Sequence, residues 1–322
     1  MRIDVPGRIH LGLISMHSGA YRQNGGLGFA IDIPSVSLRY SPGHTNEVVD
    51  SRGFPLPCAQ LDDLRHWAAD AAGRLSLSSF GRFEILSGFP PHVGLGSGTA
   101  TRLAILEIFC SVAGLDFDHE LAVSLSGRGG ASGIGLKTYF NGGFVFDLGR
   151  KNDGEAPRSS DDYLSVERAP LLIDSRPMPP WSFGLAILKG ASTPIEKERE
   201  VFANVAVFSE SDSKYALYHA IMGVQAAVSE GDKETFDSGV RALQSSRWKT
   251  REWDIQPEAI QVFRAFLERE SATFIALSSM GPAVIFCADD TASVVSTAKA
   301  EFSDKFDLAM VSPQNSGRVF AK

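Results

Sequence analysis

The sequence predicts an α+β fold divided into two lobes. Strand-like and helix-like patterns of apolar residues follow one another along all 322 residues. They lack the regular strand–helix–strand alternation of a parallel sheet, and no internal repeat is present. Composition changes at residues 150–162, which are polar, and again at the proline-rich residues 177–180. These changes predict a first lobe over residues 1–175 and a second over residues 176–322.

The first lobe is expected to open with a strand and then to mix strands with helices. Alternating apolar residues predict strands over residues 3–14, 28–33, 36–40, 83–87 and 143–148. Apolar residues spaced three and four apart predict helices over residues 61–75, 99–112 and 119–125. The stripe in the first of these helices is typical of a face that packs on a core.

The second lobe is expected to alternate in the same irregular way. Its predicted strands cover residues 181–188, 274–277, 283–287 and 308–311. Its predicted helices cover residues 213–229, 233–243, 257–267 and 291–302, the third of them capped by Asp254.

The composition is that of an ordinary globular enzyme. Hydrophobic residues make up 43% of the chain and charged residues 21%, which excludes a disordered protein. The net charge of −7 argues against binding to nucleic acid or to anionic membranes. Basic residues that matter for function must therefore be gathered locally at a site.

Cysteine usage and the N-terminal residues favour a cytoplasmic protein. The chain has three cysteines, an odd number, and they lack Cys-x-x-Cys spacing: Cys58, Cys110 and Cys287. This pattern is typical of reduced thiols. The first residues lead directly into a strand, and no apolar run approaches the length of a membrane span. A homodimer is the default expectation for an acidic enzyme of this size.

The most informative segment is a glycine-serine turn that opens into an apolar helix. It comprises Gly94, Gly96, Ser97, Gly98 and Thr99. Backbone N–H groups at such a helix start converge on one spot, which suits a diphosphate or triphosphate. The turn lacks the lysine of a Walker loop and the spacing of a dinucleotide fingerprint. The alternative is a turn that simply caps the helix.

Three further segments, taken with this turn, resemble the GHMP small-molecule kinase superfamily in order and position. They are residues 6–12, residues 132–135 with the glycine pair 142–143, and residues 278–283. The resemblance covers essentially the whole chain. It implies an N-terminal lobe like ribosomal protein S5 domain 2, a ferredoxin-like C-terminal lobe, and a ligand bound between the lobes.

Gly135 departs from the kinase pattern. The kinases carry at this position an aspartate that acts on the acceptor hydroxyl, and glycine can neither take a proton nor polarise a nucleophile. The resemblance is therefore to the beta-ribofuranosylaminobenzene 5′-phosphate synthase branch, of tetrahydromethanopterin biosynthesis. The segments that carry it are residues 8–14, 22–28, 92–99, 127–135 and 278–282. Met280, where an aromatic is expected, and residues 151–174 fit less well.

The resemblance implies a reaction and its partners. The branch condenses 5-phosphoribosyl 1-diphosphate with 4-aminobenzoate, an aromatic carboxylic acid, and releases pyrophosphate and carbon dioxide. Mg²⁺ is the implied cofactor. The alternatives are a C-glycoside synthase of nucleoside-antibiotic pathways, an ATP-dependent kinase with another carboxylate in place of the aspartate, and a non-catalytic ligand sensor.

Candidate catalytic residues are Arg8, His10 and Arg128. A guanidinium matches phosphate oxygens two at a time, and His10 shares a strand face with Arg8. Candidates for binding the donor phosphates are Arg22, Gly25, Gly26, His92, Gly94, Gly96, Ser97, Gly98, Thr99, Gly129, Gly130, Ser132, Ser278, Ser279 and Gly281. Ser97 and Thr99 are expected both to contact a phosphate or a magnesium-bound water and to cap the helix. Residues of lower rank are Lys137, Lys197, Arg199, Glu200 and Asn315.

Overall fold

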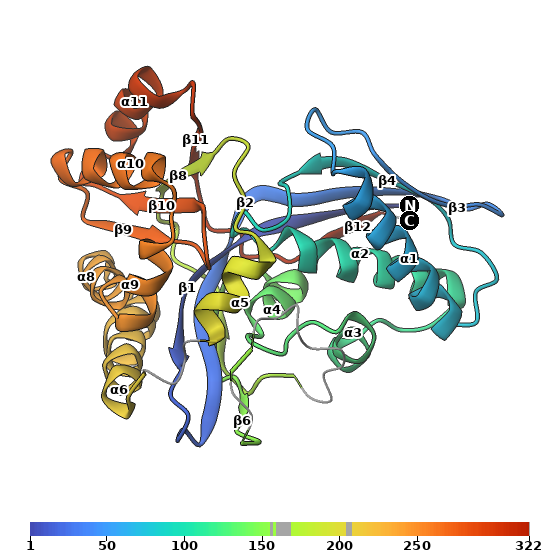
Figure 1. The fold of residues 1–322 in the computed structure, drawn as a ribbon, viewed down its shortest axis with the longest axis horizontal. Helices are drawn as coiled ribbons and strands as arrows, with labels where there is room; N and C mark the ends of the chain where they lie inside the picture. The colour runs from blue at the N-terminus through green and yellow to red at the C-terminus, as the bar shows by residue number, and fades with distance from the viewer. Residues whose placement is uncertain (155–156, 159–168, 204–207, 322) are drawn as a thin grey trace.

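Two β-sheets, one in each half of the molecule, organise the fold (Figure 1). The computed structural model describes residues 1–154, 157–158, 169–203 and 208–321. Helices pack on both sheets, and the predicted α+β class is confirmed. No helix among the described residues is long and apolar enough to cross a membrane.

The first sheet is built on two long strands that pair along most of their length. Its strands are β1 (Arg2–Ser15), β2 (Arg22–Ser41), β3 (Asn46–Asp50), β4 (Gly81–Gly88), β5 (Phe144–Asp147), β6 (Arg150–Lys151), β7 (Leu172–Arg176) and β12 (Val319–Ala321). Their order is β12-β1-β2-β4-β3, with β5 and β6 beside β2 and β7 beside β5. β2 runs through Pro34, where two separate strands were predicted, because the register against β1 shifts there and absorbs the proline.

Four helices pack with this sheet through one apolar cluster. They are α1 (Cys58–Arg74), α2 (Ser97–Ala113), α3 (His119–Ser126) and α4 (Ile134–Asn141). α2 is apolar along most of its length, and the buried face that its sequence predicts lies against the sheet. The start of α2 therefore has a fixed position above β1.

The second sheet has the strand order of a ferredoxin-like lobe. Its strands are β8 (Phe183–Leu188), β9 (Phe274–Leu277), β10 (Ala283–Cys287) and β11 (Phe306–Val311), in the antiparallel order β11-β8-β10-β9. The helices of this half are α6 (Glu210–Tyr218), the π-helix η3 (His219–Gln225), α7 (Ala226–Glu230), α8 (Lys233–Gln244), α9 (Arg247–Asp254), α10 (Glu258–Arg269) and α11 (Thr291–Phe302). The ferredoxin-like strand order expected for the second lobe is confirmed.

The two sheets share one hydrophobic core. Phe29 of β2 lies 5.3 Å from Phe183 of β8 and 6.5 Å from Phe236 of α8, measured between ring centroids. Aromatic pairs at these separations add to the free energy gained by burial. A site between the halves therefore rests on a packed junction.

Several elements differ from those expected. α9 and α5 (Ile195–Ala203), which lies between the halves in Figure 1, were not predicted because charged residues dominate both segments. Asp254 ends α9 and does not cap the next helix, whose N-cap is Pro257. Residues 155–156 and 159–168 of the expected connecting loop lie outside the described residues. The chain passes from the first sheet to the second between β7 and β8, and β12 returns to the first sheet.

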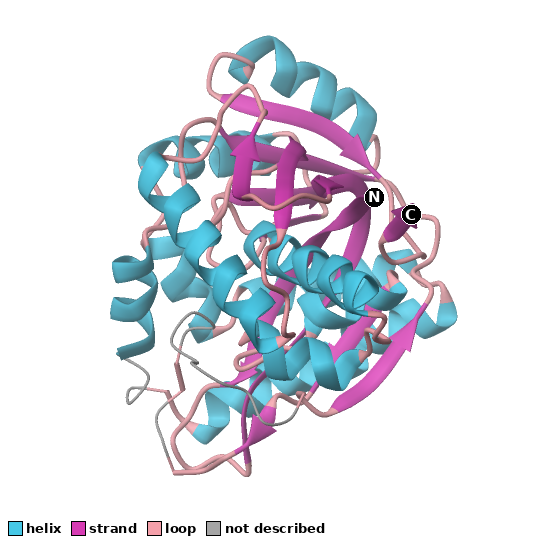
Figure 2. Ribbon diagram, turned by 90° about the vertical axis from the view of Figure 1, so that its right-hand side faces the viewer, coloured by secondary structure: helices cyan, strands magenta, loops and turns pink. Residues whose placement is uncertain are grey.

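The return of the chain to the first sheet is anchored by a buried carboxylate. Glu107 of α2 accepts two hydrogen bonds from Arg318 Nε and Nη2, the shorter at 2.6 Å, and a third from Tyr139 Oη at 2.6 Å. β12 then pairs with β1, and the two ends of the chain lie side by side in Figures 1 and 2.

Replacing Arg318 with alanine is expected to lower the free energy of unfolding by about 2–3 kcal/mol, because the Glu107 carboxylate loses its charge partner while it stays buried. Urea denaturation measures the change. The control is Arg82→Ala, which breaks an exposed pair with Glu47 and should change stability by less than about 0.5 kcal/mol. Equal effects of the two substitutions would contradict the anchoring role.

Candidate functional site

Three glycine-rich segments meet on β1 and are joined there by hydrogen bonds. Arg8 N donates to Leu95 O at 3.2 Å. Two residues further along, His10 N donates to Ser278 Oγ at 3.1 Å, and Ser278 Oγ donates to Gly94 O at 2.7 Å. Segments more than 180 residues apart in sequence are thus held together. We call this arrangement the motif junction.

The start of α2 leaves its backbone donors without a side-chain cap. Its N-cap is Gly96, with φ of 77°, and neither Ser97 nor Thr99 caps the helix, contrary to expectation. Ser97 Oγ instead donates to Pro90 O at 2.8 Å. Gly94 must be glycine, since a Cβ there would lie 2.2 Å from the Ser278 carbonyl oxygen. The bare helix start is suited to an anion.

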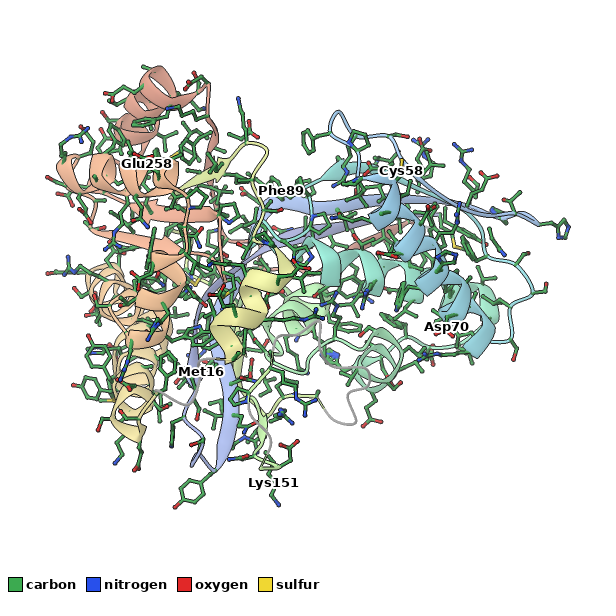
Figure 3. All side chains as sticks on the ribbon, in the orientation of Figure 1. Met16, Cys58, Asp70, Phe89, Lys151 and Glu258 are labelled. Carbon is green, nitrogen blue, oxygen red and sulfur yellow. The ribbon has the colours of Figure 1, made fainter. Side chains whose placement is uncertain are left out.

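Three adjoining cavities surround this helix start, and Arg128 lines all of them. The turn cavity, of about 120 Å³, lies over residues 94–99 and reaches Arg8 and Gly281. The inner cavity, of about 70 Å³, continues from it past His10 to Glu252. The outer cavity, of about 200 Å³, lies on the other side, against Phe89, which Figure 3 labels near the junction of the two halves.

Arg8 is a half-buried cation whose side chain lines this space. Its Nε and Nη1 atoms have no hydrogen-bond partner among the described residues. A Cβ at Gly96 would lie 3.2 Å from Arg8 Nε, so the guanidinium lies against the glycine-serine turn of residues 94–99, which we call the phosphate turn after its expected ligand. Burial lowers the pKa of Arg8 to about 10, and the charge of Glu198 acts in the opposite direction. Arg8 therefore remains a cation at neutral pH and can bind an anion.

His10 presents a neutral ring to the inner cavity. Burial, followed by the charges of Arg8 and Lys249, holds the pKa of His10 well below its ordinary value. Its side chain is buried, and Nδ1 has no hydrogen-bond partner among the described residues. A neutral ring of this kind can donate a hydrogen bond to a bound substrate or accept one from it.

The loop that carries Arg128 is held from behind by Asp147 of β5. Asp147 accepts hydrogen bonds from Gly133 N at 3.0 Å and from Gly149 N at 2.7 Å. Arg22, predicted to bind phosphate, donates to Gly149 O at 2.6 Å on the same side. Arg22 therefore supports the backbone behind the loop and does not line the three cavities.

Most of the predicted site residues come together around the three cavities. Those that line them are Arg8, His10, His92, Gly94, Gly96, Ser97, Gly98, Thr99, Arg128, Gly129, Ser132, Ser279 and Gly281. Those that do not are Arg22, Gly25, Gly26, Gly130 and Ser278. Ser278 nevertheless belongs to the motif junction, and Gly26 lies against it, since its Cβ would be 3.0 Å from His10 Nε2.

Two contacts that involve the lower-ranked candidates are structural. Lys197 pairs with Glu200 at 3.0 Å on the exposed side of α5. Asn315 accepts a hydrogen bond from Met178 N and donates one to Met178 O. These bonds fix the backbone around Asn315. Neither residue lines the three cavities.

Sequence reasoning missed two carboxylates and the loop anchor. Glu198 of α5 and Glu252 of α9 line the inner cavity, and Asp147 holds the Arg128 loop from behind. The charged run 196–200 was a signal, but its spacing did not reveal that Glu198 points inward. No pattern in the sequence marked Glu252 or Asp147, because their roles depend on contacts between distant segments.

The fold and this site define the class of protein. The homoserine kinase of Cytophaga hutchinsonii shares the fold, with a TM-score of 0.67 and 17% identity over 99% of this chain and 96% of its own. The chain has the GHMP kinase fold, as the motifs implied. No protein-family model matches it.

The sequence relatives are more specific. The chain is 27% identical to beta-ribofuranosylphenol 5′-phosphate synthase of Methanothermobacter thermautotrophicus, over 99% of this chain and 98% of the relative. It is 28% identical to the synthase of the same name from Archaeoglobus fulgidus, over 91% and 89%. The predicted resemblance to a synthase branch of this superfamily is confirmed, and so is the prediction that the chain is an enzyme.

Substitution of Asp147 should change how stability depends on pH. Burial raises the pKa of this carboxyl from an ordinary value of 3.8 to about 7. A pKa that is higher in the folded state favours folding while the group is protonated, and this contribution is lost as pH rises to 7. The free energy of unfolding of the wild type, relative to Asp147→Asn, should therefore fall by on the order of 1 kcal/mol per pH unit from about pH 4 to 7.

Urea denaturation of both proteins from pH 4 to 8 measures this difference. Asp62→Asn, which alters an exposed carboxylate on α1, serves as the control and should follow the wild type. Parallel curves for wild type and Asp147→Asn would show that the buried carboxyl does not titrate in this range.

Proposed function

We propose that this protein is a phosphoribosyl transferase that joins 5-phosphoribosyl 1-diphosphate to an aromatic carboxylic acid through a carbon–carbon bond. The observation that carries the proposal is the composition of the inner cavity. Arg8 and Arg128 line this cavity, the bare start of α2 adjoins it in the turn cavity, and Gly135 stands where kinases of this fold have an aspartate. The site can stabilise a leaving diphosphate and lacks a base at the kinase position.

The donor diphosphate is proposed to occupy the turn cavity. The N–H groups at the start of α2, together with Arg8 and Arg128, would bind its oxygens. When the bond between C1 of ribose and the diphosphate oxygen breaks, negative charge grows on the diphosphate. Donors already fixed in place stabilise that charge. The ribose centre becomes similar in character to an oxocarbenium ion.

The acceptor chemistry explains why no base is required at Gly135. The ring carbon that bears the carboxylate bonds to C1 of ribose, and carbon dioxide then leaves without its bonding electrons, which restore the aromatic ring. A hydroxyl or amino group in the para position makes the ring nucleophilic. The expected acceptor was 4-aminobenzoate, whereas the curated relatives are named for a ribofuranosylphenol. We therefore propose a benzoate with a para hydroxyl or amino group.

Mg²⁺ is proposed to accompany the diphosphate. No cluster of three or more metal-ligating side chains occurs in the described part of the chain. Mg²⁺ commonly binds through substrate phosphates and one or two carboxylates. Glu198 and Thr99 line the same cavity as Arg8 and supply oxygen ligands of the type that Mg²⁺ prefers. The ion would neutralise charge on the leaving group.

We also propose a cytoplasmic homodimer. Two buried free thiols, Cys110 and Cys287, suit a reducing compartment. Exposed apolar residues Tyr218 and Met222 lie on adjacent turns of α6 and η3 and offer a surface for a second copy. Light scattering after size-exclusion chromatography would test the dimer.

The direct test is incubation with 5-phosphoribosyl 1-diphosphate, Mg²⁺ and either 4-hydroxybenzoate or 4-aminobenzoate. The proposal requires pyrophosphate, carbon dioxide and a C-riboside 5′-phosphate in equal amounts. A kinase remains the second candidate because Glu198 supplies a carboxylate near Arg8 that could replace the missing aspartate. ADP release from ATP with a small alcohol, and no C-riboside, would favour the kinase.

Arg128→Ala is expected to lower kcat by about 100-fold or more, because a cation that contacts all three cavities no longer stabilises the departing diphosphate. Steady-state kinetics with the donor and the better acceptor measure the loss. Arg65→Ala, which removes an exposed arginine of α1, is the matched control. If Arg128→Ala kept a near-wild-type kcat and donor affinity, the proposed role of Arg128 in the site would be wrong.

Gly135→Asp is expected to lower the synthase activity roughly tenfold or more without creating phosphoryl transfer from ATP, because a carboxylate beside Arg8 repels diphosphate. A Cβ at Gly135 would lie 3.4 Å from Thr99 Cγ2 and 3.9 Å from Arg8 Nε, which are ordinary contact distances, so the backbone there can carry a side chain.

Gly135→Ala adds the same Cβ without charge and should retain most of the activity. The comparison distinguishes the steric effect of the side chain from the effect of its charge. Both variants are assayed for C-riboside and for ADP. A gain of phosphoryl transfer to a small alcohol in Gly135→Asp would identify a kinase site that had lost its base.

A further inference from the structure

One wall of the inner cavity is apolar, although the rest of the cavity is charged. Leu13, Phe202 and Met280 come from three distant segments and belong to one buried cluster. The ring of Trp248 lies behind Phe202, with centroids 5.0 Å apart and planes at 63°. A phosphate or a ribose gains little from such a wall, whereas the face of an aromatic ring packs well on it.

A fixed carboxylate lines the same cavity. Glu252 is 2% exposed, accepts a hydrogen bond from Trp248 Nε1 at 2.6 Å, and lies 2.5 Å from Lys249 Nζ. Lys249 Nζ also donates to Leu277 O at 2.7 Å and to Ser279 O at 3.1 Å. The pair is thereby tied to the motif junction. Because a carboxylate offers about four acceptor positions, Glu252 can accept a further donor from the cavity.

Arg8 and the Lys249–Glu252 pair lie at different positions along β1. Arg8 lies at the phosphate turn. Gly12 is four residues further along, roughly 13 Å at the usual rise of a strand. A Cβ at Gly12 would lie 3.4 Å from Lys249 Cε, so the Lys249–Glu252 pair lies near this far end. A buried carboxylate repels the diphosphate and carboxylate groups of the substrates, and therefore suits a substrate group that donates a hydrogen bond.

We propose that the inner cavity binds the aromatic acceptor with its ring against Leu13, Phe202 and Met280, and that Glu252 accepts a hydrogen bond from its para hydroxyl or amino group. This inference rests on the proposed function and names its acceptor-selecting residue. The carboxylate-bearing carbon of the ring then faces the donor at the turn, and the para group faces α9. Lys249 and Trp248 act as positioning residues for Glu252.

The arrangement selects benzoates that carry a para donor. 4-Methylbenzoate has nearly the size of 4-hydroxybenzoate but lacks the donor, so it binds against Glu252 without a hydrogen bond. The wild type should bind 4-hydroxybenzoate about 10- to 100-fold more tightly, the range expected for one hydrogen bond to a charged group. Calorimetric titration of each acid, with pyrophosphate and Mg²⁺ present, measures the ratio without requiring turnover.

Two substitutions test the residue. Glu252→Gln keeps the size of the side chain and removes its charge, and Glu252→Asp keeps the charge and withdraws it by one methylene. Both should lower the ratio of the two affinities at least about fivefold while leaving the affinity for pyrophosphate unchanged. If Glu252→Gln does not fold, Glu252→Asp, which retains a partner for Lys249, decides alone. A wild type without preference, or a variant that keeps the wild-type ratio, would overturn the inference.

A second pair of variants tests which cavity holds the ring. Phe202→Ala should weaken 4-hydroxybenzoate binding about tenfold or more, because it removes the apolar wall. Phe89→Ala, in the outer cavity, should not weaken it. The reverse result would place the ring in the outer cavity and overturn the inference. The proposed function fails separately, if no acceptor yields a C-riboside with the wild type whatever the binding ratios.

Discussion

The motif junction on β1 is the constraint on which the rest of the site depends. Ser278 accepts from the backbone of His10 and donates to Gly94, so one hydroxyl joins the opening strand, the phosphate turn and the loop before β10. This loop comes from the second sheet, while the turn starts a helix that covers the first. The two halves are thus joined beside the turn and inner cavities, and a displacement of either half would change the geometry of these cavities.

Charged groups of the site lie at successive positions along β1. β1 runs from Arg8, against the bare start of α2, toward the buried pair of Lys249 and Glu252. The neutral ring of His10 lies between these groups. In the proposed reaction, this arrangement would place the donor diphosphate near Arg8 and the acceptor ring near Glu252. If the proposed function holds, the glycine-serine turn would keep its phosphate-binding role on this fold, while the residues around Glu252 would set the acceptor.

The sequence predicted the parts of the site that are local. The turn at residues 94–99 could be recognised because glycine and helix-start preferences are encoded within a few residues. Glu252 and Asp147 could not, because each acts through a contact with a segment distant in sequence. Arg22 had the right residue type beside the right motif, yet it hydrogen-bonds carbonyls behind the loop. In the fold, short strands such as β3 and β12 escaped prediction because their pairing is set by tertiary context.

The pairing of β12 with β1 has a consequence for synthesis. Arg2 is paired with Ala321, and Arg318 reaches back to Glu107, so the first sheet lacks an edge strand until residues 318–321 have left the ribosome. During translation, β1 can pair with β2 while its outer edge remains open to other chains. Pairing of β12 is therefore the step that covers the outer edge of β1, although more than 300 residues separate the two strands.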